Sequence, residues 1–196
     1  NESSTYLYIL KSGRVKLTSA MPGGRNQIIG VVSPGHLLGV DTLNEEFYPY
    51  SATATGTATV GRFKHKAMLD TLNEHPSIAT QLCDDLNEKL AQTRTLIEAM
   101  GRRTAVEKIA ACILFMQHQD KSGVEESPIQ LSRRELAEML GLAEEPICRV
   151  IAELRRTGII EAPRGNIIVR DRERLQDIAD ENPISRYKPL KCTAAQ

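Results

Sequence analysis

The sequence lacks the cysteine patterns of disulfide-rich and metal-binding proteins. Its four cysteines, Cys83, Cys112, Cys148 and Cys192, are scattered and show neither paired zinc spacing nor a disulfide framework. A signal peptide is also lacking, as is any apolar run long enough to span a membrane. Together these absences predict a cytoplasmic protein with no membrane partner.

An excess of charge of one sign is absent as well. The 25 basic and 25 acidic residues cancel, which excludes a protein that coats nucleic acid through a broadly basic surface. The sequence contains no P-loop, nucleophile–base pair, zinc spacing or carboxylate pair of the kind that enzymes use, so we expect no enzyme. With 196 residues, the chain is long enough for two small domains.

The segment 131–156 predicts a helix-turn-helix, the motif that places a helix in the DNA major groove. Ser132 and Glu135 have the spacing of a capping box, which predicts that a first helix begins there. Gly141 then ends that helix, and a second helix is expected from about residue 143 to 157. The second helix would be the one that enters the groove.

Glu145 and Arg149 are four residues apart near the start of this second helix and therefore share one face. Arginine can bind guanine O6 and N7, and glutamate can accept from cytosine N4, so we predict base contacts from both residues and from Cys148. An ordinary surface ion pair is the alternative. The helix-turn-helix context favours double-stranded DNA as a partner.

A β-hairpin is predicted to follow the two helices as a wing. The runs 159–162 and 166–170 are short and β-rich, and they flank the turn Pro163-Arg164-Gly165. Polar and basic side chains around this motif are expected to hold phosphates without specifying sequence. These predicted phosphate contacts are Ser132, Arg133, Arg134, Arg164 and Asn166.

A long helix, from about Ser77 to Arg102, is expected near the middle of the chain. Apolar positions recur there at alternating spacings of three and four residues, which is the seam of a two-stranded coiled coil. Packing against the chain's own β domain is the alternative, but the narrow strip favours a homodimer. The predicted seam consists of Cys83, Leu86, Leu90, Thr93, Ile97 and Met100.

The first 75 residues have short β-rich segments separated by Gly, Pro and Ser, without long helices between them. Such a texture indicates an all-β barrel or roll. The expected strands lie near residues 6–10, 14–18, 27–32 and 52–60.

At these residues the chain resembles the CRP/FNR family of bacterial transcription regulators, nearly throughout its length. The family's recognition helix carries E-x-x-x-R, which Glu145 and Arg149 match, and LYILKSGRVKL at 7–17 is close to a strand-turn-strand of its cyclic-nucleotide-binding β-roll. The FNR branch has E-x-x-S-R, whereas Cys148 replaces the serine here. Glu144 stands where the cAMP receptor branch has an arginine. The resemblance therefore implies an FNR-like palindrome with TTGA-type half-sites, with the outermost base in doubt because a thiol is a poor donor.

The resemblance implies an α+β fold with a β-roll that is truncated at its start, a long dimerisation helix and a C-terminal winged helix-turn-helix. It also implies RNA polymerase as a partner and allosteric control, in which an effector shifts the dimer helix. The expected boundaries are an effector-sensing roll at 1–75, the helix at 76–103, the DNA-binding domain at 104–182 and a tail at 183–196.

In the expected effector pocket the chain departs from the cyclic-nucleotide binders. These carry Gly-Glu for the ribose and Arg-Ser/Thr-Ala for the cyclic phosphate, whereas we align Gly35-His36 and Tyr50-Ser51-Ala52 to those positions. Without the carboxylate and the arginine the two strongest polar anchors are missing, so cAMP is not expected. His36, Tyr50, Ser51 and Thr93 are the pocket candidates.

No cofactor is assigned by the sequence. Gly61 stands where an FNR-type iron–sulfur cluster has a cysteine ligand, so such a cluster is not expected. Haem remains an alternative with His36 as candidate ligand, although a polar surface histidine explains this residue as well. Thiol sensing at Cys83 or Cys148 is a further alternative. The sequence thus predicts a regulator that senses an effector, redox or gas signal, or else an effector-independent factor whose roll is only a scaffold.

Overall fold

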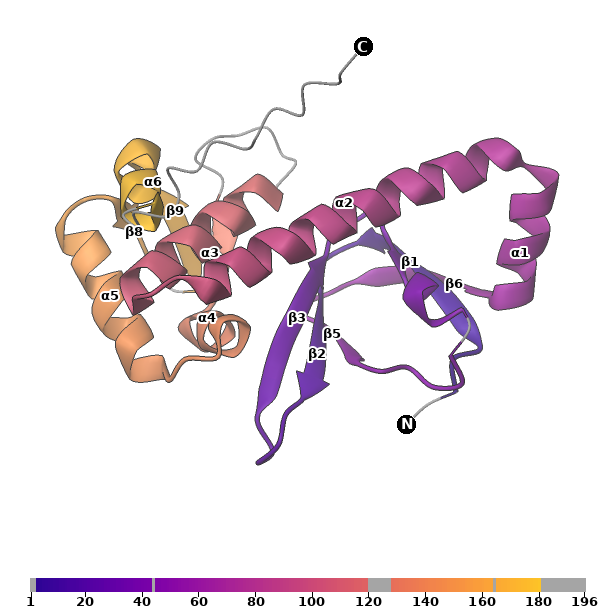
Figure 1. The fold of residues 1–196 in the computed structure, drawn as a ribbon, viewed down its shortest axis with the longest axis horizontal. Coiled ribbons are helices and arrows are strands. Elements are labelled where there is room, and N and C mark those ends of the chain that lie inside the picture. The colour runs from indigo at the N-terminus through magenta and orange to yellow at the C-terminus, as the bar shows by residue number, and fades with distance from the viewer. Residues whose placement is uncertain (1–2, 44, 120–127, 164, 181–196) are drawn as a thin grey trace, which may run out of the picture. The chain divides into compact units, whose positions relative to one another are not determined.

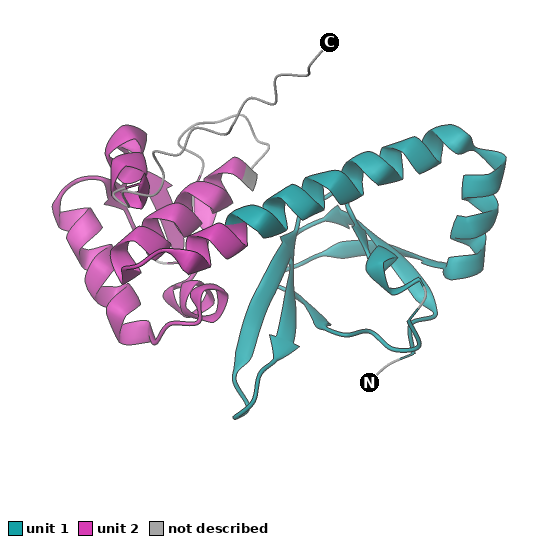
Figure 2. Cartoon of the chain, viewed as in Figure 1, with its two compact units in different colours: residues 1–95 teal, residues 96–196 magenta. Residues whose placement is uncertain are grey.

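The computed structural model describes residues 3–43, 45–119, 128–163 and 165–180. The chain divides into two compact units, residues 1–95 and 96–196 (Figure 2). The first unit is mostly β-sheet followed by helix, and the second is mostly helical with one small sheet (Figure 1). The expected α+β fold, with a β-roll and a helix-turn-helix, is confirmed.

The roll of the first unit consists of two three-stranded antiparallel sheets, with strand orders β4-β1-β6 and β3-β2-β5. Its elements are β1 Tyr6–Ser12, β2 Val15–Ala20, β3 Asn26–Val32, β4 Leu37–Leu38, the 3-10 turn η1 Val40–Thr42, β5 Ser51–Ala54 and β6 Thr59–Lys64.

The core of the roll forms where apolar side chains of several strands meet. Leu10 of β1, Val15 of β2, Val32 of β3 and Leu38 of β4 are buried in one cluster. Between β1 and β2 the chain turns at Gly13, whose φ of +87° favours glycine. A Cβ added there would lie 2.4 Å from the Thr57 carbonyl oxygen, so this turn has no room for a side chain.

Two helices follow the roll, α1 His65–Glu74 and α2 Pro76–Gly101. The boundary between the units falls within α2, whose residues 96–101 belong to the second unit. Met68 of α1 is buried with Leu7 and Val40 of the roll, and Leu82 of α2 packs against that cluster. One face of α2 is therefore fixed to the roll.

The second unit follows α2 with four helices and a small antiparallel sheet of order β7-β9-β8 within its described residues. Apolar side chains from all of these helices and from β8 are almost fully buried, among them Ile113, Leu136, Ile151, Ile160 and Leu175. The elements are α3 Ala105–Gln119, β7 Ile129–Gln130, α4 Arg133–Leu140, α5 Glu144–Arg156, β8 Ile160–Glu161, β9 Asn166–Val169 and α6 Arg172–Asp180.

Some sequence-based expectations fall outside the described residues, namely Arg164 at the tip of the wing, Cys192 and the tail at 183–196. Among the helices that the structure describes, none is long and apolar enough to cross a membrane.

Candidate DNA-binding face and effector cavity

The start of α4 is fixed by the predicted capping box. The Glu135 amide donates to Ser132 Oγ over 3.2 Å, and the Ser132 amide donates to Glu135 Oε2 over 2.9 Å. Gly141 ends the helix with a φ of +64° and leads into Ala143, the extended residue before α5. Local chemistry at these positions therefore sets the turn between the two helices.

One face of α5 is buried and the opposite face is exposed. The buried side chains are Ile147, Val150, Ile151 and Leu154, each at most 4 % exposed. Because they repeat at three- and four-residue spacing, they hold α5 in one rotation about its axis. The intervening positions, including Glu145, Cys148 and Arg149, face solvent.

Glu145 and Arg149 lie together on the exposed face near the helix start. Their side chains are 86 % and 74 % exposed, and Glu145 Oε1 is 3.9 Å from Arg149 Nη1. Such a long, solvated ion pair stabilises little, so either group can leave it for a base edge at small cost. Cys148, also exposed, lies between them in the sequence.

The predicted phosphate contacts have different environments. Arg133 is exposed, and Arg134 is exposed while its Nε donates to Glu138 Oε1 over 3.0 Å. The Ser132 hydroxyl also donates to Glu135 Oε2 over 2.8 Å, so the cap already uses it. Asn166 begins β9 and is half-buried. Their phosphate contacts remain predictions.

The wing is an antiparallel pair of short strands. Ile160 of β8 pairs with Val169 of β9, and both are buried. After β9, Arg170 donates to both carboxylate oxygens of Glu161, over 3.0 and 3.1 Å. This fork lowers the pKa of Glu161 from its ordinary value and ties the two ends of the hairpin together.

The predicted dimer seam forms an apolar strip on α2. Leu86, Leu90 and Ile97 are 39 %, 51 % and 63 % exposed, unusual values for large aliphatic side chains. Cys83 and Thr93 are exposed too, whereas Met100 is half-buried. Leu82, which packs on the roll, lies one turn before Leu86, so the strip borders the face of α2 that contacts the roll.

A cavity of about 690 Å³ lies in the roll. Tyr50 and Ser51, predicted as pocket residues, both line it, together with Tyr8, Leu38 and Gly39. His36 and Thr93 do not belong to this lining. Thr93 lies on α2, where its hydroxyl donates to the Lys89 carbonyl oxygen over 2.9 Å.

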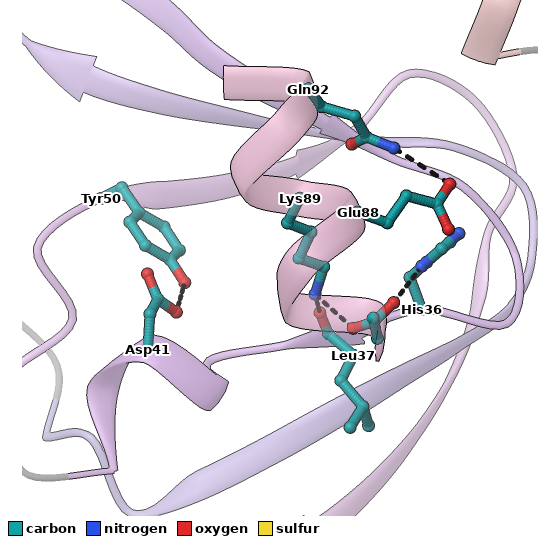
Figure 3. A network of polar contacts seen from close by, with 8 residues as sticks. His36, Leu37, Asp41, Tyr50, Glu88, Lys89 and Gln92 are labelled. Carbon is teal, nitrogen blue, oxygen red and sulfur yellow. Dashed lines mark hydrogen bonds and ion pairs between the residues drawn. The ribbon is translucent and has the colours of Figure 1, made fainter. Parts of the chain in front are cut away.

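His36 instead contacts α2 (Figure 3). Its Nδ1 is paired with Asp85 Oδ1, and Lys89 Nζ lies 3.1 Å from Asp85 Oδ2. Lys89 also donates to the Leu37 carbonyl oxygen over 2.6 Å. Burial tends to raise the pKa of Asp85, but His36 and Lys89 outweigh it and hold that pKa below its ordinary value. We call His36, Asp85 and Lys89 the roll–helix clasp.

The described histidine and cysteine side chains differ in whether a metal ion or a thiol reagent could reach them. Over the described ranges, no group of three or more His, Cys, Asp or Glu side chains is placed to hold a metal ion. His36 has Nδ1 in the clasp, so a metal could reach only Nε2 without breaking it. Cys112 is fully buried, and burial raises its pKa to about 12, whereas Cys83 and Cys148 are exposed.

Sequence reasoning missed three residues that organise this region. Asp41 accepts from the Tyr50 hydroxyl over 2.6 Å, and Asp85 and Lys89 complete the clasp. The four-residue spacing of Asp85 and Lys89 is a signal for a helical ion pair. Nothing local indicates that Asp41 would meet Tyr50 or that Asp85 would meet His36.

Comparison with known domains matches both units. Residues 1–75 match the cyclic nucleotide-binding domain, and residues 107–178 match the Crp-like helix-turn-helix domain. The two matches cover the roll and the face that carries Glu145 and Arg149.

Similar proteins are regulators rather than enzymes. The nitrogen fixation regulation protein FixK of Bradyrhizobium diazoefficiens is 30 % identical over 179 residues, which are 90 % of this chain and 75 % of that protein. The transcriptional activator protein FnrL of Cereibacter sphaeroides is 27 % identical over 87 % of this chain and 71 % of its own length.

A solved structure has the same fold. FixK2 from Bradyrhizobium japonicum superposes with a TM-score of 0.78 at 24 % identity, over 91 % of this chain and 89 % of that chain.

Proposed function

Because the chain belongs to the CRP/FNR family of transcription regulators, we propose that it is a homodimer that binds a palindromic promoter site. Its activity would be controlled by a small effector, or by a redox or gas signal, sensed in the roll, and cAMP would not be that effector. RNA polymerase is the proposed further partner, and a promoter target implies that the regulator works in the cytoplasm.

The exposed start of α5 carries this proposal. A capped α4, a glycine turn and a buried α5 face together present Glu145 and Arg149 to solvent with only a long ion pair between them. An arginine and a glutamate so placed can read guanine and cytosine in the major groove. Cys148 replaces the serine of the FNR branch, so we propose TTGA-type half-sites with altered preference at the outermost base.

The test is the replacement of Arg149 by alanine. We expect Arg149→Ala to weaken binding to the cognate palindrome by about 1–3 kcal/mol and to relax the preference at one guanine. Affinity would be measured by fluorescence anisotropy on the cognate site and on each single-base variant of it.

The matched control is Arg155→Ala, which removes the same charge from an exposed position in the last turn of the same helix. It should leave the base preference unchanged. Equal loss of affinity on every sequence for Arg149→Ala would show that this residue contacts phosphate rather than a base, and would contradict the proposed reading.

The apolar strip on α2 supports the homodimer. Leu90 and Ile97 are more than half exposed in the single chain, and burying them against a second copy would remove apolar surface from water. Two copies would bring two recognition helices to successive major grooves, which is how a palindrome is read.

The segment 36–39 supports coupling between the roll and α2. Leu38 and Gly39 line the cavity, while the neighbouring His36 side chain and Leu37 carbonyl bind Asp85 and Lys89 of α2. A ligand that shifts this segment would therefore also displace α2, the helix that carries the apolar strip. This contact provides a route for an allosteric signal if the ligand binds two positions of the segment with different affinity.

The nature of the signal is tested first by an absorption spectrum of anaerobically purified protein, with metal analysis of the same sample. A Soret band would assign haem, with His36 Nε2 as the ligand to mutate, and a broad visible shoulder with iron and sulfide would assign a cluster. A featureless spectrum would leave two candidates for the signal, a small molecule that binds the roll or an oxidant that reacts with the cysteines. DNA binding that no signal alters would instead favour the effector-independent factor.

A further inference from the structure

The cavity of the roll has the size of a small-molecule site, is open to solvent on one side, and has polar as well as apolar surface. Its volume of about 690 Å³ lies within the range of roughly 300–1,000 Å³ that such pockets occupy. Val15, Leu38 and Val60 contribute aliphatic surface, and Tyr8, Tyr48 and Tyr50 contribute aromatic rings. Several lining positions are alanine, and these short side chains leave the space open.

No charged side chain is found among the residues that line this cavity, all of which belong to the part of the chain the structure describes. An anion that bound against this lining would lose part of its hydration without gaining a cation from it. The cost of moving an unpaired charge out of water is large, so the lining selects against phosphates and carboxylates.

The carboxylate of Asp41 meets Tyr50, one of the residues that line the cavity (Figure 3). The Tyr50 hydroxyl donates to Asp41 Oδ1 over 2.6 Å. Burial, and then the Asp41 carboxylate, raise the pKa of Tyr50, so the phenol stays neutral. Its proton is committed to Asp41, and the Gly39 backbone amide already faces the phenol oxygen as a donor, so one lone pair is left to accept from a ligand. The same carboxylate repels a second anion.

We infer that this cavity binds an uncharged small molecule with both polar and apolar groups, whose hydrogen-bond donor faces the Tyr50 oxygen. The inference rests on the proposed function, because it names the class of effector for the same roll. It assigns Tyr50 and Asp41 as the polar contact and excludes cyclic nucleotides by charge. Shape alone would not distinguish these classes, because the cavity is large enough for either.

The test compares two probes of equal size, 2-naphthalenemethanol and 2-naphthoate, by calorimetric titration of the full chain at pH 7.5 without DNA. We expect the alcohol to bind at least about tenfold more tightly than the carboxylate, which corresponds to about 1.4 kcal/mol. Cyclic AMP is titrated alongside. Equal or tighter binding of the carboxylate or of cyclic AMP would overturn the inference, as would a failure of the alcohol to bind.

Three variants locate the site. Ala52→Trp fills the cavity and should abolish binding of the alcohol, whereas Ala67→Trp, at an exposed position of α1, should not. Asp41→Asn keeps the shape and removes the charge, so it should raise the affinity of the carboxylate severalfold. Tyr50→Phe should weaken binding of the alcohol severalfold. An unchanged preference in Asp41→Asn would contradict the electrostatic argument even if Ala52→Trp failed to fold.

DNA binding is measured separately on the same preparations. If the protein binds a palindrome specifically but does not bind the alcohol, the inferred class of ligand is wrong and the proposed function as a DNA-binding regulator is retained. Loss of sequence-specific DNA binding would overturn the proposed function whatever the probes do.

Discussion

At the scale of single residues, the local environment gives cysteine side chains different pKa values and different exposure. Cys112 is buried among apolar side chains, and this burial raises its pKa to about 12, while Cys83 and Cys148 are exposed. Because the thiolate is the nucleophile, the protonated Cys112 should be inert in the folded protein.

Alkylation tests this difference. With iodoacetamide at pH 8 we expect Cys148 to be modified and Cys112 to react only after unfolding, as measured by mass spectrometry of the peptides. Modification of Cys112 as fast as Cys148 would show that the α3 core opens in the native state. Bound cognate DNA should slow the reaction of Cys148 and leave Cys112 unchanged.

Ser132 has two predicted roles, a helix cap and a phosphate contact. Ser132→Ala should destabilise the second unit by about 1 kcal/mol because the amide of Glu135 loses its acceptor. Ser132→Asp restores an acceptor for the Glu135 amide but places a second carboxylate beside that of Glu135, so it should recover only part of the melting temperature and still weaken DNA binding. Undiminished DNA affinity in Ser132→Asp would mean that no phosphate lies near this residue.

The residue scale also marks the limit of sequence reasoning. The face of Glu145 and Arg149 follows from helical spacing alone, and the structure exposes both. The place of His36 does not follow from spacing, because its partner Asp85 is 49 residues away. Only the folded roll brings the two together, so His36 was predicted for a cavity that it does not line.

At the scale of elements, the patterned segments were predictable and the unpatterned ones were not. The three–four repeat of α5 indicates its buried face, and the same repeat in α2 marks the apolar strip that the single chain leaves exposed. The apolar run at the start of β1 is followed by a Ser-Gly turn, which indicates a strand. In α3 the positions Ile109, Ala110, Cys112, Ile113 and Leu114 are all buried, so no single stripe marks a helix. The charged α6 buries only Leu175 and Ala179, too few positions for a pattern.

The roll–helix clasp should make the stability of the first unit depend on pH. The pKa of Asp85 is lowered in the folded protein, so its stabilisation is present above the ordinary value of 3.8 and is lost as the pH falls below it. Asp85→Asn should cost about 1 kcal/mol at pH 7 and much less at pH 3.

Tyrosine fluorescence during urea unfolding measures this effect, because the chain has no tryptophan and its described tyrosines all lie between residues 6 and 50. Asp84→Asn, at the exposed neighbouring position, is the control and should leave stability unchanged at both pH values. A cost for Asp85→Asn that is the same at pH 3 and pH 7 would show that the carboxylate charge does not hold the clasp.

At the scale of the whole molecule, the proposed homodimer is tested at the exposed strip on α2. Leu90→Asp should abolish the dimer, because an unpaired carboxylate would be buried in an apolar seam. Sedimentation velocity measures the state directly. Thr95→Asp adds the same charge at an exposed position off the strip and should remain dimeric.

A Leu90→Asp protein that still sediments as a dimer would place the interface elsewhere. If the seam is correct, alkylation of Cys83 should be slow in the wild type and fast in Leu90→Asp, since Cys83 belongs to the same strip. Cognate palindrome binding should fall with the dimer, while weak non-specific binding should persist.

The order of residues along the chain has a practical consequence. Every residue that lines the cavity lies between Tyr8 and Val60, and the exposed residues proposed to contact bases all come after α2. The proposed effector site and the proposed base contacts are therefore encoded in consecutive, non-overlapping stretches of the gene. A library confined to the first stretch could retune what the protein responds to without rewriting the promoters it recognises, which makes this chain a suitable chassis for building transcriptional biosensors.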